Sequence, residues 1–372
     1  MSTLLRSIAV AYFGFATATA LATPTLDAAL AYSDSVELGP AFVTDRAELA
    51  PGRQAIEPAS AYASLSDEQC CSGVDCGSDV DFDLGCGCPS LWTVRAGAVV
   101  MHRSRPNEGV IARTDPGGVP VSNAADFSFD WAGGPDVSII RRTARGNAWE
   151  LRYFGVLNST ATRAYGDPGN FQIPPVTFLN LDDLNAEYST TLHSTELNWL
   201  HPVTPRVALI AGFRWVEISD DLNYVVGYPG LQEINLRSNV NNRLYGAQTG
   251  ADVSLWNRGG PLTMNGVIKA GVYGNTADNV ISSVNSFTGV DSIGSFRSAA
   301  PTSFVGEINL VATYQLTKHI ALRGGYQLLW LDQLGLASNS LIRSIEENEP
   351  YMIDTDGSLF YNGAMMGGEF AW

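Results

Sequence analysis

The sequence predicts an all-β fold, an antiparallel up-and-down transmembrane β-barrel of about ten strands, or twelve. Three observations predict it. Apolar and polar residues alternate with a period of two through most of residues 90–372, which is the pattern of strands with two different faces. The connections between these segments are alternately short and long. The final segment ends the chain on an aromatic residue, Trp372.

The alternation is clear in the segment RVALIAGFRWVEIS. Leu209, Phe213 and Trp215 lie on one face of this strand, whereas Arg214 lies on the other. Comparable segments place the strands near residues 91–104, 126–142, 148–161, 186–200, 206–219, 242–256, 262–275, 303–316, 320–334 and 358–372.

The connections divide into two kinds. Those at 144–147, 201–205, 257–260 and 317–319 are short, whereas those at 105–125, 162–185, 220–241, 276–302 and 335–357 are long. Outer-membrane barrels have short periplasmic turns and long external loops, so we expect this location, with both barrel termini periplasmic. Aromatic residues near strand ends fit the interfacial girdles of such barrels: Trp92, Trp149, Trp199, Trp215, Trp256 and Trp330. A soluble exported β protein, a third class, would lack a lipid-facing apolar belt.

The apolar C-terminus follows from the same architecture. An open sheet edge cannot be left in lipid, so the last strand must pair with the first. Phe370 and Trp372 would then face the bilayer or its interface. Their spacing resembles the C-terminal insertion signal of outer-membrane barrels, which implies the barrel assembly machinery as a partner.

The N-terminus predicts export. Arg6 precedes an apolar stretch at 8–15, and Ala20-Leu21-Ala22 fits a small-x-small cleavage site, so residues 1–22 are interpreted as a signal peptide. Residues 23–89 are rich in Ala, Ser, Pro and Asp. We expect them to form a flexible periplasmic segment, followed by the barrel at 90–372.

Five cysteines cluster at the end of that segment. An exported chain meets an oxidising compartment, which favours disulfides over a metal site, and the adjacent and C-x-C spacings differ from usual zinc spacings. The number is odd, so one thiol is left over or pairs elsewhere. The predicted disulfide cysteines are Cys70, Cys71, Cys76, Cys86 and Cys88.

The composition argues against several classes of function. A net charge of −16 argues against nucleic acid as a partner, which needs clustered basic charge. None of the four histidines lies in a catalytic motif, and no G-x-S-x-G, HExxH or P-loop pattern occurs, so we expect neither an enzyme nor a cofactor. The acidic pairs at 182–183 and 220–221 are interpreted as solvated loop residues rather than calcium ligands.

Polar strand faces carry charges of both signs. Rings of charged side chains set selectivity in channels, whereas paired charges can instead hold a closed barrel rigid. The residues predicted to form a lumen constriction are Arg95, Glu150, Arg152, Arg214, Asp252, Lys269, Glu307 and Arg323, and the same faces carry Asp126, Asp130, Glu196 and Glu369.

The motifs of the first two strands resemble a known family. Trp92 and Arg95 form a W-x-x-R pattern, residues 126–135 form D-F-x-F-D-x-x-x-G-P, and Arg141 and Arg142 follow. Over residues 86–372 the chain is similar to the β-barrel porin family of planctomycete-type bacteria. The resemblance implies an outer-membrane barrel but supplies no established substrate.

Two functions stay open at this stage. The expected one is a porin-like channel for passive passage of small solutes or ions. The alternative is a closed structural or surface-binding barrel that acts through its long external loops, because barrels of about eight strands are filled by side chains whereas those of 16–18 leave an aqueous channel. Outer-membrane lipid is an expected partner. A homo-oligomer and cell-surface partners are compatible with the sequence, which determines neither.

Overall fold

The structure is a computed structural model that describes residues 91–114, 118–173, 176–227, 234–285, 290–346 and 352–372. The predicted signal peptide, the segment at 23–89 and the five cysteines lie outside the described residues.

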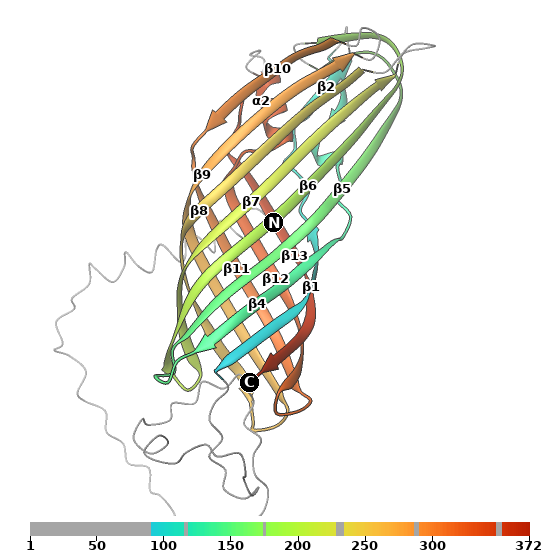
Figure 1. Ribbon diagram of the computed structural model, residues 1–372. Helices are drawn as coiled ribbons and strands as arrows, with labels where there is room; N and C mark the ends of the chain where they lie inside the picture. The colour runs from blue at the N-terminus through green and yellow to red at the C-terminus, as the bar shows by residue number, and fades with distance from the viewer. Residues whose placement is uncertain (1–90, 115–117, 174–175, 228–233, 286–289, 347–351) are drawn as a thin grey trace, which may run out of the picture. The chain divides into compact units, whose positions relative to one another are not determined.

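Ten antiparallel strands form a closed ring (Figure 1), which confirms the predicted fold class. Each strand pairs with the next strand of the ring along the chain, and the last pairs with the first. The ring consists of β1 (Trp92–Arg103), β4 (Ala132–Arg142), β5 (Ala148–Ile173), β6 (Val176–Thr204), β7 (Val207–Gly227), β8 (Ile234–Asn257), β9 (Leu262–Asn285), β11 (Thr302–Gln315), β12 (Ile320–Leu334) and β13 (Gly357–Ala371).

The seam between β1 and β13 closes the barrel. The two strands pair from Thr93 opposite Ala371 to Arg103 opposite Tyr361. Backbone hydrogen bonds between Trp92 and Trp372, 3.1 and 3.0 Å long, extend the pairing to the final residue. The C-terminal residues therefore belong to the wall, as the sequence predicts.

Glycine permits a close approach at this seam. Gly97 lies opposite Gly367, and a Cβ atom at Gly97 would overlap the carbonyl oxygen of Met366. A side chain at this position would therefore push the two strands apart, so the absence of a Cβ is a packing requirement.

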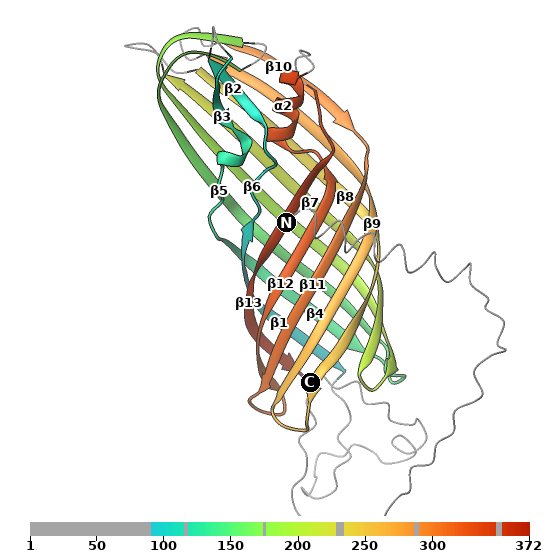
Figure 2. The ribbon, with the colours of Figure 1, turned by 180° about the vertical axis from the view of Figure 1, so that it is seen from behind.

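The short connections lie together at one end of the barrel, which we call the turn end, and the C-terminus lies there too (Figures 1 and 2). The opposite, loop end differs from the sequence-based expectation. β5 to β9 are 26, 29, 21, 24 and 24 residues long, so much of the chain expected as long loops continues as wall. Asp183, Asp220 and Asp221, expected in loops, lie within strands.

The outside and the inside of the wall change in polarity along the long strands, as β7 illustrates. Near the turn end, Leu209 and Phe213 of β7 are exposed on the outside, whereas Arg214 is buried inside. Towards the loop end, Leu222 and Tyr224 are fully buried inside, and Asp221 pairs with the exposed Arg237 on the outside. On β7 the exterior is therefore apolar near the turn end and polar towards the loop end, whereas β9 and β10 still expose Val280 and Phe296 towards the loop end.

Two connections fold into the loop-end half of the lumen (Figure 2). The first contains β2 (Val110–Thr114), β3 (Pro120–Asn123) and η1 (Ala124–Asp126), and the last contains α2 (Ala337–Glu346). Buried side chains of both, including Ile111 and Leu341, pack in one cluster with inward residues of the wall. We call these two connections the plug. β10 (Val290–Ala299) pairs with β9 outside the ring.

One predicted strand boundary is wrong, because the residues before β4 belong to the first connection of the plug. The second strand was expected from residue 126, but β4 begins at Ala132. Asp126 instead completes a capping box with Asn123, and Asp130 also precedes the strand. Pro135 lacks an N–H donor, and pairing of β4 with β5 starts at the next residue, Asp136.

Asp220 anchors both parts of the plug. Its carboxylate lies 2.8 Å from Nη1 of Arg103 and accepts hydrogen bonds from the Tyr188 hydroxyl (2.6 Å) and the Ala337 backbone N–H (2.9 Å). The Arg103 guanidinium lies 4.1 Å from the ring centroid of Phe129. The arginine and aspartate side chains are fully buried, so one carboxylate joins the wall, α2 and the segment after η1.

We predict that Asp220→Asn destabilises the barrel by about 3–5 kcal/mol, because it leaves the Arg103 charge buried and uncompensated. Asp221→Asn is the matched control. This neighbouring aspartate pairs on the outside with Arg237, which is 58% exposed, so its loss should cost at most about 1 kcal/mol. Urea unfolding of the refolded protein, followed by tryptophan fluorescence, measures both changes. Equal losses in the two variants would contradict the anchoring role.

Candidate lumen site

Charged side chains from five strands meet across the lumen in what we call the ion-pair layer. Its members are Arg152 on β5, Glu196 on β6, Arg214 on β7, Lys269 on β9 and Glu307 on β11. Because each residue faces inward in its strand and the barrel is narrow, side chains from well-separated strands of the ring reach one another.

The two carboxylates bridge the three cations. Glu307 accepts from Nη1 of Arg152 and from Nη1 of Arg214, both at 2.7 Å, and lies 3.2 Å from Nζ of Lys269. Glu196 accepts from Lys269 at 2.7 Å. Asp136 of β4 holds the other edge of Arg152 at 3.0 and 3.2 Å. These six groups carry equal numbers of positive and negative charges.

Neutral polar groups add hydrogen bonds to the layer, although Oε1 of Glu196 and Nη2 of Arg214 make none within the described part of the chain. Ser194 accepts from Nε of Arg214 at 2.9 Å, Gln248 donates to Glu196 at 2.8 Å and Asn309 donates to Glu307 at 2.6 Å. The Glu196 and Glu307 side chains are 0% exposed, and that of Arg214 is 1% exposed. Water is therefore excluded from the centre of the layer, and the charges are compensated by one another.

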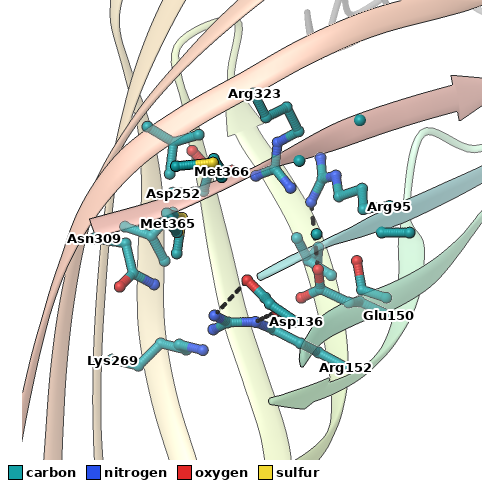
Figure 3. A pocket seen from close by; sticks show the side chains of 18 of the residues that line it. Arg95, Asp136, Glu150, Arg152, Asp252, Lys269, Asn309, Arg323, Met365 and Met366 are labelled. Carbon is teal, nitrogen blue, oxygen red and sulfur yellow. Dashed lines mark hydrogen bonds and ion pairs between the residues drawn. The ribbon is translucent and has the colours of Figure 1, made fainter. Parts of the chain in front are cut away.

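A cavity of about 80 Å³ lies on the turn-end side of the layer (Figure 3). Its lining includes Arg95, Glu150, Asp252 and Arg323 as well as parts of the layer. The Arg95 and Arg323 side chains are 20% and 21% exposed. Solvent thus reaches this part of the lumen, in contrast to the layer itself.

On its loop-end side the layer is covered by apolar packing. Phe154, Val216 and Tyr273 are inward residues slightly farther along their strands, and each is at most 1% exposed. The guanidinium groups of Arg152 and Arg214 lie 4.8 and 5.5 Å from the centroid of the Phe154 ring. Beyond this packing lies the plug, whose buried side chains, including Ile111 and Leu341, pack against inward residues of the wall.

All eight residues predicted for the constriction face the lumen, at two levels. The structure brings Arg152, Arg214, Lys269 and Glu307 together in the ion-pair layer. It places the other four around the cavity: Arg95, Glu150, Asp252 and Arg323.

The buried group of Arg103, Tyr188 and Asp220 was not predicted from the sequence. Asp220 and Asp221 were both interpreted as loop residues. The available signal was the alternation of apolar residues at 216, 218, 222 and 224, which continues the strand and directs Asp220 inward.

The histidines are engaged in local contacts. His193 lies 2.8 Å from the Tyr153 hydroxyl, His201 lies 2.7 Å from Asn147, and His319 lies 2.8 Å from the carbonyl oxygen of Ala371. His102 packs against Trp131. Among the described residues, no three His, Cys, Asp or Glu side chains are grouped so that they could hold a metal ion.

No helix in the described part of the chain has the length and apolarity to cross a membrane. No protein-family model matches the sequence, and no curated protein matches it. The resemblance to the planctomycete-type porin family therefore stays a prediction.

Several solved outer-membrane barrels are similar in structure. The outer-membrane protease OmpT from Escherichia coli matches 75% of this chain and 97% of its own, with 11% identity and a TM-score of 0.41. The Pseudomonas putida toluene transporter TodX matches 77% and 91%, with 9% identity and a TM-score of 0.33. The translocator domain of the Neisseria meningitidis autotransporter NalP matches 78% and 91%, with 11% identity and a TM-score of 0.35.

The closed antiparallel barrel of this chain rests on its own strand pairing, and these distant likenesses add no function to it. The neighbours include a protease, a transporter and a translocator domain, and at such identities none of these activities transfers. The expectation that this chain is not an enzyme stays a prediction.

We predict that Glu307→Gln destabilises the barrel by about 3–5 kcal/mol, because Arg152 and Arg214 lose the carboxylate that compensates them in a buried site. Glu217→Gln is the matched control, since Glu217 pairs with Arg243 on the exterior at 3.9 Å and should contribute at most about 1 kcal/mol. Urea titrations of both refolded variants provide the comparison. A decrease of less than about 1 kcal/mol in the free energy of unfolding for Glu307→Gln would show that Arg152 and Arg214 do not depend on this carboxylate for compensation of their charges.

Proposed function

We propose that the chain is an outer-membrane channel for small solutes or ions that is shut, in the described conformation, at the ion-pair layer. The observation that carries the proposal is the meeting of charges of both signs at one level of the lumen, next to a cavity that solvent reaches.

The exterior supports a membrane location. Outward apolar side chains surround the turn-end half of the barrel, and Tyr326 donates to the outward Asn362 at 2.9 Å, so this polar group has a partner within the belt. Barrels in outer membranes carry such a belt about 25 Å tall. Its members, between 44% and 66% exposed, include Ile139, Leu151, Leu197, Leu209, Phe213, Ile268, Val272, Ile308, Leu310, Leu322, Tyr326, Met366 and Phe370.

The change in character of the two wall faces along the strands indicates which part of the barrel the bilayer surrounds. Beyond the belt the outside carries more polar residues and the inside more apolar ones, as expected for a wall surrounded by water. We therefore propose that the bilayer covers the turn-end half, that the loop-end half projects outside the cell, and that both barrel termini lie on the periplasmic side.

The energetics of the lumen support a channel. Buried ion pairs are often replaceable by apolar side chains without loss of stability, so a barrel that only needs rigidity has no requirement for them. Charges that line a path are instead useful when the path is hydrated, because they set which ions pass.

A closed barrel that acts through its loop end is the second candidate. The apolar packing around Phe154, Val216 and Tyr273 and the plug beyond it favour this function, because an open path would require both to move. The two candidates differ in whether the folded protein conducts.

The membrane location predicts position-dependent costs on one face of β9. Ile268→Arg should destabilise the folded state in lipid by about 2–4 kcal/mol, as expected for arginine near the bilayer midplane. Thr276→Arg, on the same exposed face but beyond the belt, is the control and should change stability by no more than about 1 kcal/mol. Unfolding in phospholipid vesicles measures both. Equal costs at the two sites would contradict the proposed bilayer position.

The channel proposal predicts discrete conductance of the refolded protein in a planar bilayer. Lys269→Gln removes one of three cations from the layer, so openings should become more frequent and the cation-to-anion permeability ratio should rise by about tenfold or more, since a nearby unit charge is worth several kcal/mol. Lys318, the only other lysine, lies in an exposed turn, and Lys318→Gln should change neither quantity.

Absence of current from folded, inserted wild-type and Lys269→Gln proteins would reject the channel and leave the closed barrel. Equal selectivity shifts in the two lysine variants would place the constriction elsewhere than at the ion-pair layer.

A further inference from the structure

We propose that the turn-end cavity binds a small zwitterion, an amino acid of few atoms, with its carboxylate on Arg323 and its ammonium group on Asp252. This inference deepens the proposed function, because it names the solute class of the same lumen. It concerns equilibrium binding rather than current, so either can fail without the other.

Most charged groups around the cavity are already compensated within the protein. Arg95 donates to Glu369 at 2.9 Å and lies 3.4 Å from Glu150. Asp136 is held by Arg152 at 3.0 and 3.2 Å. A solute would have to break these pairs in order to use them.

Arg323 on β12 is different. Its Nε is buried and makes no hydrogen bond to the described part of the chain. The nearest carboxylate oxygen, Oε2 of Glu369, lies 3.8 Å away and already accepts from Arg95. A buried donor without an acceptor is costly. Although Nε itself is buried, the side chain as a whole is 21% exposed, so a solute carboxylate can reach the guanidinium group.

Asp252 on β8 is the corresponding anion at this cavity. Its Oδ1 accepts from the amide of Asn265 at 2.8 Å, but it forms no ion pair with any described residue. In the ring, β11 and β9 separate β8 from β12, so a carboxylate held only by an amide and a guanidinium that shares Glu369 with Arg95 face one cavity from two parts of the wall (Figure 3). A simple anion would satisfy only Arg323, whereas a zwitterion satisfies both.

The size of the cavity limits the solute. Its volume is about 80 Å³, the space of roughly three liquid waters, whereas drug-sized ligands occupy pockets of about 300–1,000 Å³. Glycine and β-alanine are of suitable size and carry one charge of each sign.

The test is a ligand titration of the full refolded protein in detergent micelles, followed by saturation-transfer NMR, with glycine, β-alanine, acetate and methylammonium as probes. We expect glycine or β-alanine to bind at least about tenfold more tightly than either singly charged probe. Arg323→Gln and Asp252→Asn should each weaken this binding by about tenfold, the scale of one charge-assisted hydrogen bond. Arg145→Gln in an exposed turn and Asp221→Asn on the exterior should leave it unchanged.

Acetate binding as tightly as glycine, with no effect of Asp252→Asn, would overturn the proposal in favour of a simple anion site. Lack of saturable binding by any probe would also overturn it. The comparison among the four probes needs only wild-type protein, so a variant that fails to fold does not remove the test. A barrel that binds glycine but carries no current would sustain this proposal while rejecting the channel.

Discussion

Closure of β1 on β13 is the constraint on which the rest of the structure depends. In lipid each backbone donor and acceptor must be paired within the protein, and an open sheet edge leaves a row of them unpaired. The seam runs to the last residue, where Trp92 and Trp372 exchange hydrogen bonds. A ring of ten strands is also narrow, so inward side chains from opposite walls come into contact. The charged layer, the apolar packing and the plug all follow from this limited width.

Charge compensation determines how the lumen is divided. In the ion-pair layer, carboxylates and cations from several strands pair with one another in a buried site. Around the cavity, nearer the turn end, the charges are less well compensated. Glu369 is shared by Arg95 and Arg323, and Asp252 has only the amide of Asn265 as a hydrogen-bond partner. Both the buried layer and the cavity that solvent reaches are lined by inward charged residues. The two regions differ in how many partners the wall provides for each of these charges.

The long strands combine two environments in one wall. Near the turn end the outside of β7 is apolar and Arg214 points inward, whereas near the loop end Asp221 is outside and Tyr224 is inside. The first arrangement suits lipid around a polar lumen, and the second suits water around an apolar core. The plug completes that second core, and Asp220 joins it to the wall. If the lumen conducts, the plug and the layer must both rearrange, and the Asp220 contacts restrain the plug.

The sequence by itself predicted a closed antiparallel barrel of about ten strands, or twelve, and predicted that Arg152, Arg214, Lys269 and Glu307 lie on the polar face of their strands, because a period of two decides which side chains share a face. It also predicted that residues 358–372 belong to the wall, because apolar and polar residues alternate along them, and their pairing with β1 confirms this. It did not show that β5 to β9 continue into the segments expected to be loops. Beyond the apolar belt the inward residues of these strands are more often apolar and the outward residues more often polar, so the pattern of apolar outward residues that identified the strands ends there. Only the tertiary structure decided which charges meet, since partners such as Arg152 and Glu307 are brought together by strand stagger and barrel radius rather than by spacing along the chain. The same holds for Arg103 and Asp220, whose pairing requires the plug to be folded inside.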